Sequence, residues 1–184
     1  MRILGISGSL RRGSHNTSLL RAAATLLPPG VELEVYDGLR DLPPYDPDHD
    51  LEPAEPAVAR LRDAIAAVDG VLIATPEYNG SIPGLLKNAL DWASRPFPDS
   101  SLKGKPVAVI GASSGLFGAA WAQADVRKVL GIIGADVIED ELPVGMADST
   151  IIDGELVEAE QRDVLESLVH VLVARAGAAG AQAA

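Results

Sequence analysis

The chain has 184 residues, of which 47% are hydrophobic, and this length supports one well-cored domain but not two ordinary ones. The formal net charge of -11 at pH 7 argues against a broad basic face for nucleic acid or for an anionic membrane, so any bound anion must be held locally. The lack of cysteine excludes disulfides, thiolate metal sites and a cysteine nucleophile, so redox chemistry would need a bound cofactor.

Apolar runs alternate with segments of helical periodicity along the chain. The strand-like runs are 2–7, 32–37, 70–75, 106–112 and, less regular, 135–142. The helical segments are 17–27, 53–67, 83–94, 119–133 and 158–175. Several strands are apolar throughout, and strands that alternate with helices form right-handed βαβ units, as in a parallel sheet covered on both faces. Five such strands predict an α/β, flavodoxin-like three-layer sandwich with sheet order 2-1-3-4-5.

The two ends of the chain carry little further structure in this interpretation. The amino-terminal apolar run stops at Ser7, which is too short for a signal peptide or a membrane span. We therefore expect a cytoplasmic protein that does not use a membrane. The low-complexity carboxyl end predicts a flexible tail at 177–184 behind a single domain of residues 1–176.

Three loops follow strands at the edge of the sheet where such folds bind ligands. In an open parallel sheet, ligands lie beyond the carboxyl ends of the strands, at the point where the strand order reverses. The loops at 8–16, 76–83 and 113–118 should therefore converge in space. The first of them reads GSLRRGSHN, which is more polar chemistry than a plain turn requires.

The first loop does not match the common nucleotide or hydrolase motifs. Its glycine spacing is that of a Walker A loop, but Ser14 and His15 stand where lysine and Ser/Thr are needed. Gly5, Gly8 and Gly13 do not form a G-x-G-x-x-G dinucleotide fingerprint. No G-x-S-x-G elbow of an α/β-hydrolase occurs in the chain.

The remaining interpretation of this loop is that it binds a terminal phosphate at a helix N-terminus. Exposed backbone N–H groups and the helix dipole favour an anion there. Ser9, Ser14, Asn16 and Thr17 add side-chain donors, and Asn16 is also placed to cap the helix. Arg11 adds a charge-assisted contact. The structural alternative is an exposed polar turn in front of a capped helix.

The stretch ATPEYNGSIPGLLKNALDW at 74–92 carries a resemblance to a known family. Together with GISGSLRRGSHN at 5–16 and the more generic GASSGLFGA at 111–119, it resembles the NAD(P)H-dependent FMN reductases, the flavodoxin-like group that includes quinone, chromate and azo-dye reductases. The resemblance implies FMN as cofactor and NADPH or NADH as co-substrate. These pieces extend over much of the first two-thirds of the chain.

The resemblance also implies which residues lie beside the flavin. Pro76, Glu77, Tyr78, Asn79 and Gly80 would border the isoalloxazine ring, which agrees with the ability of an Asn-Gly turn to direct backbone amides at a ligand. The cofactor's pyrimidine side would face a second set, in the third loop: Ser113, Ser114 and Gly115. Backbone dipoles there would stabilise the negative charge of reduced flavin. A tight glycine turn is the structural alternative for that set.

The expected activity is that of an FMN-dependent oxidoreductase. Hydride would pass from NAD(P)H to FMN and then, in a ping-pong sequence, to a small-molecule acceptor such as a quinone, free flavin, azo compound or metal oxyanion. No side chain need act as a catalytic acid or base, and no metal site is expected. The alternative is a flavodoxin-type electron carrier that does not itself oxidise NAD(P)H, although the loop lacks the hydroxyl-rich T-x-T-G-x-T pattern. A non-catalytic flavin sensor has no positive support in the sequence.

The remaining conspicuous residues have structural interpretations. Lys87 and Asp91 have the spacing of a helical ion pair, and none of the three histidines has metal-ligand spacing. The resemblance implies a homodimer or homotetramer, for which Trp92, Phe117 and Trp121 are interface candidates, with core packing as the alternative for each.

Overall fold

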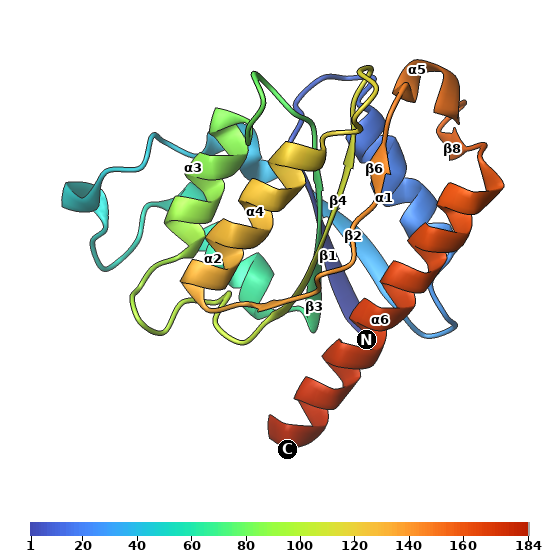
Figure 1. Cartoon of the computed structure of the whole chain (residues 1–184). Helices are drawn as coiled ribbons and strands as arrows, with labels where there is room; N and C mark the ends of the chain where they lie inside the picture. Colours follow the sequence, from blue (N-terminus) through green and yellow to red (C-terminus); the bar gives the residue numbers. More distant parts are fainter. Residues whose placement is uncertain (184) are drawn as a thin grey trace.

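The structure is a computed structural model that describes residues 1–183, and its parallel sheet forms where the apolar runs predict it. The first four strands are β1 (Arg2–Ser7), β2 (Glu32–Tyr36), β3 (Gly70–Thr75) and β4 (Pro106–Ala112). Their order is β2-β1-β3-β4, continued beyond β4 by β5 (Asp136–Val137), and every neighbouring pair is parallel. The predicted flavodoxin-like sandwich with order 2-1-3-4-5 is confirmed (Figure 1).

The fifth strand differs from its prediction as one strand over 135–142. It is divided into β5 (Asp136–Val137) and β6 (Pro143–Val144), each of which pairs with β4. Between them the acidic run 139–141 leaves the sheet, while Ile138 and Leu142 on either side stay buried. Because three successive carboxylates are costly to bury at a sheet edge, the chain bows out and then rejoins β4.

Two hydrophobic cores cover the two faces of the sheet. On one face, α1 (His15–Thr25) and α6 (Ala159–Ala183) pack against the sheet through residues such as Leu19 and Leu168. The other face is covered by α2 (Pro56–Ala66), α3 (Gly84–Ala93) and α4 (Ala120–Ile133). β3 and β4 lie in the middle and are buried along their whole length, which explains their continuously apolar sequences.

The helix boundaries agree with the predicted segments to within a few residues, except at the carboxyl end. There α6 continues to Ala183 instead of ending near Arg175, and Figure 1 shows its last turns extending past the sheet. Position 184 lies outside the described residues, so the flexible tail at 177–184 stays a prediction. Short elements that the sequence did not predict are η1 (Gly38–Asp41), η2 (Pro47–His49), α5 (Ala147–Thr150), β7 (Ile151–Ile152) and β8 (Glu155–Leu156).

The helix α6 is long and apolar enough to cross a membrane by length and composition alone, over Ala159–Ala181. Its apolar residues have another explanation in the fold. Leu165, Leu168 and Leu172 are at most 1% exposed and belong to the core on the face shared with α1. A core helix of a soluble protein has this composition too, because its apolar stripe packs on the sheet.

Candidate functional site

A cavity of about 480 Å³ lies at the carboxyl ends of β1, β3 and β4, where the three predicted loops meet. Its volume lies within the usual range for small-molecule sites. It is lined by Ser9, Arg11, Ser14, His15, Asn16, Pro76, Glu77, Tyr78, Ala112, Ser113, Ser114 and Gly115. Of the predicted site residues, Thr17, Asn79 and Gly80 are not in this lining. The expected convergence of the three loops is therefore present.

The first loop delivers the chain into the N-terminus of α1, and Ser14 is the cap. Its Oγ accepts a hydrogen bond from the backbone N–H of Thr17 at 3.2 Å, and the helix begins at His15. The prediction that Asn16 caps this helix is wrong, because a cap must precede the first helical residue and Asn16 is already the second. The helix N-terminus faces the cavity through Ser14, His15 and Asn16.

Asn16 and Thr17 use their side chains inside the protein. The Asn16 amide donates to Ala112 O at 2.9 Å and accepts from Ala112 N at 3.0 Å, which joins α1 to the end of β4. The Thr17 Oγ1 donates to Ser7 Oγ at 2.9 Å and joins α1 to the end of β1. Both residues therefore hold the helix N-terminus at the sheet edge, whether or not they also contact a ligand.

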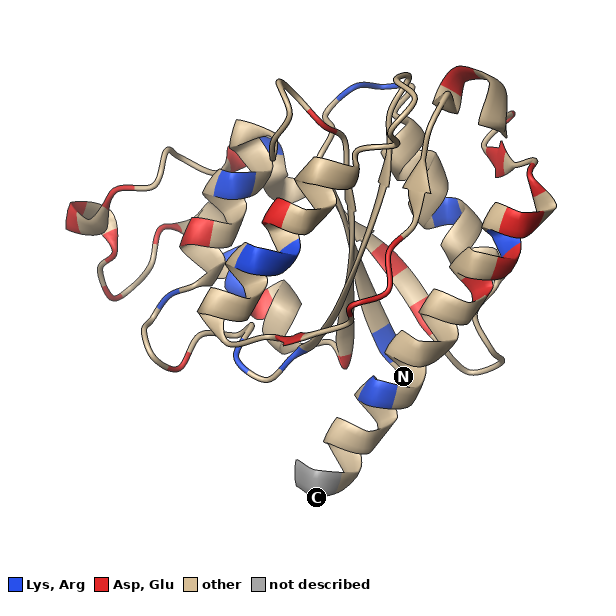
Figure 2. Ribbon diagram, in the orientation of Figure 1, with Lys and Arg blue, Asp and Glu red and all other residues tan. Residues whose placement is uncertain are grey.

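Arg11 is the one arginine in the cavity lining, and its guanidinium has no hydrogen-bond partner among residues 1–183. Its neighbour Arg12 is exposed and is not part of the lining. Figure 2 shows a basic segment on the loop that joins β1 to α1, at the carboxyl end of the sheet. On a chain of net charge -11 this is a local positive site, as the sequence predicted for a bound anion.

The second loop contains a tight turn built on Asn79 and Gly80. Both residues have positive φ angles, of 56° and 75°, and Tyr78 and Ser81 exchange backbone hydrogen bonds of 3.1 and 3.2 Å across the turn. Asn-Gly is the pair that such a turn favours. The turn leaves the N–H groups of Asn79 and Gly80 without a protein partner among the described residues, so they are free to donate to a ligand or to water.

Two side chains tether this loop to α4. Glu77 Oε2 accepts from the backbone N–H of Ala122, in the first turn of the helix, at 3.0 Å. Ser81 Oγ donates to Asp125 Oδ2 at 2.7 Å. A carboxylate at a helix N-terminus is favoured by the helix dipole. The structure therefore gives Glu77 a capping role that its sequence motif alone did not reveal.

The third loop is packed closely against the segment that follows β6. Ser113 N donates to Val144 O at 3.1 Å, and Met146 N donates to Gly115 O at 3.0 Å. At Gly118, with φ 57°, a Cβ would lie 2.4 Å from the backbone of Pro143. Side chains cannot fit at this crossing, so the glycine-rich composition of the loop has a structural cause.

His15 and Asp148 complete the site and were not among the predicted site residues. His15 Nε2 lies 2.9 Å from Asp148 Oδ1 on α5. Hydrogen bonds from Ser114, and then from His15, hold the pKa of the Asp148 carboxyl below its usual value. The position of His15 in the first loop was the only sequence signal for it. Asp148 is 133 residues away and had no such signal.

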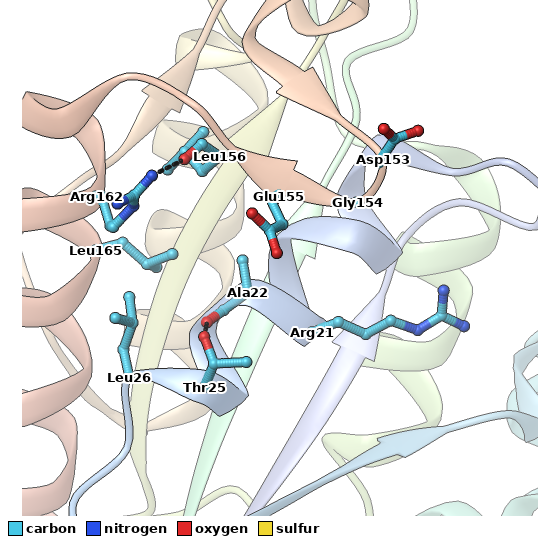
Figure 3. A pocket seen from close by; sticks show the side chains of 10 residues that line it. All are labelled: Arg21, Ala22, Thr25, Leu26, Asp153, Gly154, Glu155, Leu156, Arg162 and Leu165. Atoms are coloured by element: carbon cyan, nitrogen blue, oxygen red, sulfur yellow. Dashed lines mark hydrogen bonds between the residues drawn. The ribbon is translucent and has the colours of Figure 1, made fainter.

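A second cavity, of about 470 Å³, lies between α1, the β7–β8 hairpin and α6 (Figure 3). Its polar groups do not converge on a common point. Arg162 donates to Leu156 O at 2.9 Å, while Asp153 and Arg21 extend away from the cavity in Figure 3. This hollow is also not at the carboxyl ends of the strands, so we assign the ligand site to the three-loop cavity.

The structure shows which of the remaining conspicuous residues have the structural roles expected from the sequence. Lys87 and Asp91 form the predicted ion pair, with Nζ–Oδ1 at 2.7 Å. Trp92 is 1% exposed and donates to Pro43 O, so core packing accounts for it. Phe117 and Trp121 are 59% and 54% exposed, and their ring centroids are 4.9 Å apart.

Comparisons with known proteins identify the family of the chain. The family model for NADPH-dependent FMN reductase matches residues 1–149. An NAD(P)H-dependent FMN reductase of Pseudomonas aeruginosa is 41% identical over 174 residues, which covers 94% of this chain and 93% of the relative. A 2-hydroxy-1,4-benzoquinone reductase of a Burkholderia species is also 41% identical, over 92% of each chain.

A solved structure supports the same assignment. The FerB flavoenzyme, an NAD(P)H:(acceptor) oxidoreductase from Paracoccus denitrificans, superposes with a TM-score of 0.82 at 36% identity and covers 96% of this chain and 97% of its own. The protein is thus an oxidoreductase that uses FMN as cofactor and NAD(P)H as co-substrate. Its fold, its three-loop cavity and these relatives lead to one conclusion: the chain belongs to the NADPH-dependent FMN reductase family.

Proposed function

We propose that this enzyme oxidises NAD(P)H and reduces a quinone in two successive half-reactions at the three-loop cavity. The observation that carries the proposal is the cavity itself. It combines a helix N-terminus and a free arginine on one side with Tyr78 on the other, which begins a turn whose unpaired backbone N–H groups lie just outside the lining. These are donors for a phosphate and for the polar edge of a flat ring, respectively.

The residues of the cavity fit FMN. At Gly8 a Cβ would lie 3.0 Å from Leu86 and 3.1 Å from Pro76, so a larger residue would push the first loop away from the second. The phosphate would be held by Ser9, Arg11 and Ser14, near the N-terminus of α1. When bound, FMN would supply the redox chemistry, which is to take up hydride from nicotinamide and to pass two electrons to the acceptor.

The ring end of the cavity would orient the flavin through backbone groups. The turn at Asn79 and Gly80 presents N–H donors, and Pro76 fixes the chain as it leaves β3. Ser113, Ser114 and Gly115 would hold the pyrimidine side, where fixed dipoles stabilise added negative charge. Neither end offers a side chain that must donate or accept a proton during the reaction, so placement is the contribution of the protein.

We infer the acceptor class from the openness of the cavity and from the relatives. The rim beside the second loop carries exposed Tyr78, at 54%, and the third loop carries exposed Leu116, at 72%. Flat, partly apolar molecules suit such a rim. One relative is named for a benzoquinone, and FerB is named for an unspecified acceptor. A quinone is therefore our first choice over free flavin, azo compounds and metal oxyanions.

Steady-state kinetics test this function. Purified protein loaded with FMN should be yellow and should oxidise NAD(P)H continuously only when a quinone is added. Varying both substrates should give parallel double-reciprocal lines, because NAD(P)H and the quinone would use the same cavity in turn. A flavodoxin-type carrier would oxidise almost no NAD(P)H without a partner reductase, and intersecting lines would contradict the two-step sequence.

We also propose that the protein works as a homodimer or homotetramer in the cytoplasm. The exposed pair Phe117 and Trp121 stands at the start of α4, next to the third loop of the cavity. Exposed aromatic residues are enriched at protein interfaces. A Trp121→Glu variant should lower the molar mass measured by light scattering, because it places a charge in the proposed interface. Trp92 is buried and is therefore not available for a contact between subunits.

A further inference from the structure

The α1 end of the cavity contains a carboxylate that a site for an anion would ordinarily avoid. Asp148 lies on α5, outside the cavity lining, and its Oδ1 is 2.9 Å from Nε2 of His15, which is in the lining. The Asp148 side chain is 68% exposed and that of His15 is 19% exposed. The pair therefore connects an outer, solvated acid to an inner ring at the proposed phosphate position.

The carboxylate is held in place by the backbone around it. Ala147 N donates to Ser113 O at 3.0 Å, which joins the start of α5 to the third loop, and Thr150 Oγ1 donates to Gly145 O at 2.9 Å, which connects the end of α5 to the residues just before it. An exposed acid on a loose loop would move with the solvent, but this one is positioned by several contacts.

The nitrogen atoms of His15 then have different roles. Nε2 faces Asp148, and Nδ1 has no hydrogen-bond partner among residues 1–183. A neutral imidazole that donates from Nε2 can only accept at Nδ1, and a phosphate offers no proton there at neutral pH. The imidazolium donates from both nitrogens, and an anion on each side favours it.

We propose that Asp148 is a positioning residue that orients His15 so that its imidazolium donates from Nδ1 to the phosphate of FMN. This inference rests on the proposed function, because it needs FMN in the three-loop cavity. It assigns a role to two residues, from the first loop and from α5, that the sequence motifs did not connect.

The charged groups that face His15 come from two elements. Asp148 approaches it from α5, and Arg11, which shares the cavity lining with His15, belongs to the first loop. The third loop contributes only the uncharged Ser114. The other ionisable side chains in the lining are Glu77 and Tyr78, on the second loop.

Riboflavin, which lacks the phosphate, supplies the discriminating measurement. We expect Asp148→Asn and His15→Gln each to raise the Kd of FMN about tenfold at pH 6 and to leave the Kd of riboflavin unchanged. The double variant should be no worse than either single variant, because both remove one contact.

The matched control is Asp153→Asn, which removes the same charge from the exposed turn between β7 and β8. Asp153 has a φ of 51°, which asparagine also tolerates, and this variant should bind FMN as the wild type does. Ring-nitrogen NMR gives a readout independent of activity. With only three histidines in the chain, His15 can be assigned by His15→Gln, and its Nδ1 resonance should shift when FMN binds and stay in place when riboflavin binds.

The outcomes separate the two proposals. A wild-type protein that binds neither FMN nor riboflavin would overturn the proposed function and this inference with it. If the wild type binds both but Asp148→Asn weakens FMN and riboflavin alike, α5 has only a structural role and the inference fails. It also fails if Asp148→Asn binds FMN more tightly, because the carboxylate would then be repelling the phosphate.

Discussion

At the α1 end of the cavity the groups that we propose to bind the ligand are side chains on a loop and a helix N-terminus, whereas at the β3 end they would be backbone groups in a tight turn. The α1 end is formed by Ser9, Arg11 and Ser14, and the β3 end is the second loop with its turn at 78–81, of which Tyr78 lines the cavity. Side chains can be replaced one at a time. Backbone groups can be changed only by altering what holds the turn.

The two ends are also anchored in different ways. Asn16 joins the α1 end to β4 through two buried hydrogen bonds, inside the sheet edge. The β3 end is tethered to the outer helix α4 by Glu77 and Ser81. We therefore expect substitutions at the α1 end to divide into anchoring effects and phosphate effects, while those at the β3 end change the binding of the whole flavin.

Asn16→Ala should have the largest effect on both stability and binding. It leaves the N–H and C=O of Ala112 without partners in a buried position, since Asn16 is 3% exposed. We expect it to lower the free energy of unfolding by about 2–4 kcal/mol and to raise the Kd of FMN by more than about tenfold. Urea unfolding of the apoprotein and fluorescence titration with FMN would measure these effects.

Asn88 provides a matched control for the anchor. Its amide bonds Tyr45 N at 2.7 Å and Pro43 O at 2.9 Å, the same chemistry in a place remote from the cavity. Asn88→Ala should lower the free energy of unfolding by about 1–2 kcal/mol and leave the Kd of FMN unchanged in folded protein. If both variants lost FMN equally, Asn16 would have no special relation to the site.

Arg11→Ala tests the side-chain nature of the α1 end. We expect it to raise the Kd of FMN by about tenfold while the Kd of riboflavin stays the same, because a charge-assisted hydrogen bond to the phosphate is lost. Arg12→Ala removes the same charge from a side chain outside the lining and should change the Kd of FMN less than about twofold. Equal effects of the two variants would point to general electrostatics instead of a contact.

Much of this architecture could be predicted from the sequence, because the apolar runs that mark the strands are local patterns. The apolar runs at 2–7, 70–75 and 106–112 match β1, β3 and β4 residue for residue, since a central parallel strand is apolar along its whole length. The three loops then follow from the strand order. At 135–142 the prediction of one strand was wrong because pattern alone does not show where an acidic run leaves the sheet edge.

The finer features of the site could not be predicted because they depend on residues far apart in the chain. Asn16 was assigned to the helix cap, but its partner is Ala112, 96 residues away. Glu77 was assigned from a motif as a flavin neighbour, and its contact with Ala122 became visible only in the fold. Such pairs carry no periodic or compositional signal, so a single sequence cannot reveal them.

Glu77→Ala sharpens the comparison from the β3 end. Loss of the carboxylate uncaps α4 and releases the second loop, which should lower the free energy of unfolding by about 1 kcal/mol. We expect the Kd values of FMN and riboflavin to rise together, by about threefold to tenfold, because the ring end is shared by both ligands. Glu77→Gln keeps an acceptor for Ala122 N and should fall between wild type and Glu77→Ala.

Of these variants, Gly80→Ala should have the smallest effect on binding and stability. It tests whether the β3 end depends on backbone conformation in a way that the α1 end does not. Gly80 has a φ of 75°, so a Cβ there costs about 1 kcal/mol even though no atom lies within 4 Å of it. Gly13 at the α1 end also has no atom within 4 Å of a Cβ, but its φ is not positive. Gly13→Ala should therefore be neutral in urea unfolding. If Gly13→Ala lowered the free energy of unfolding as much as Gly80→Ala does, the view that the β3 end depends on the backbone conformation of its turn would be wrong.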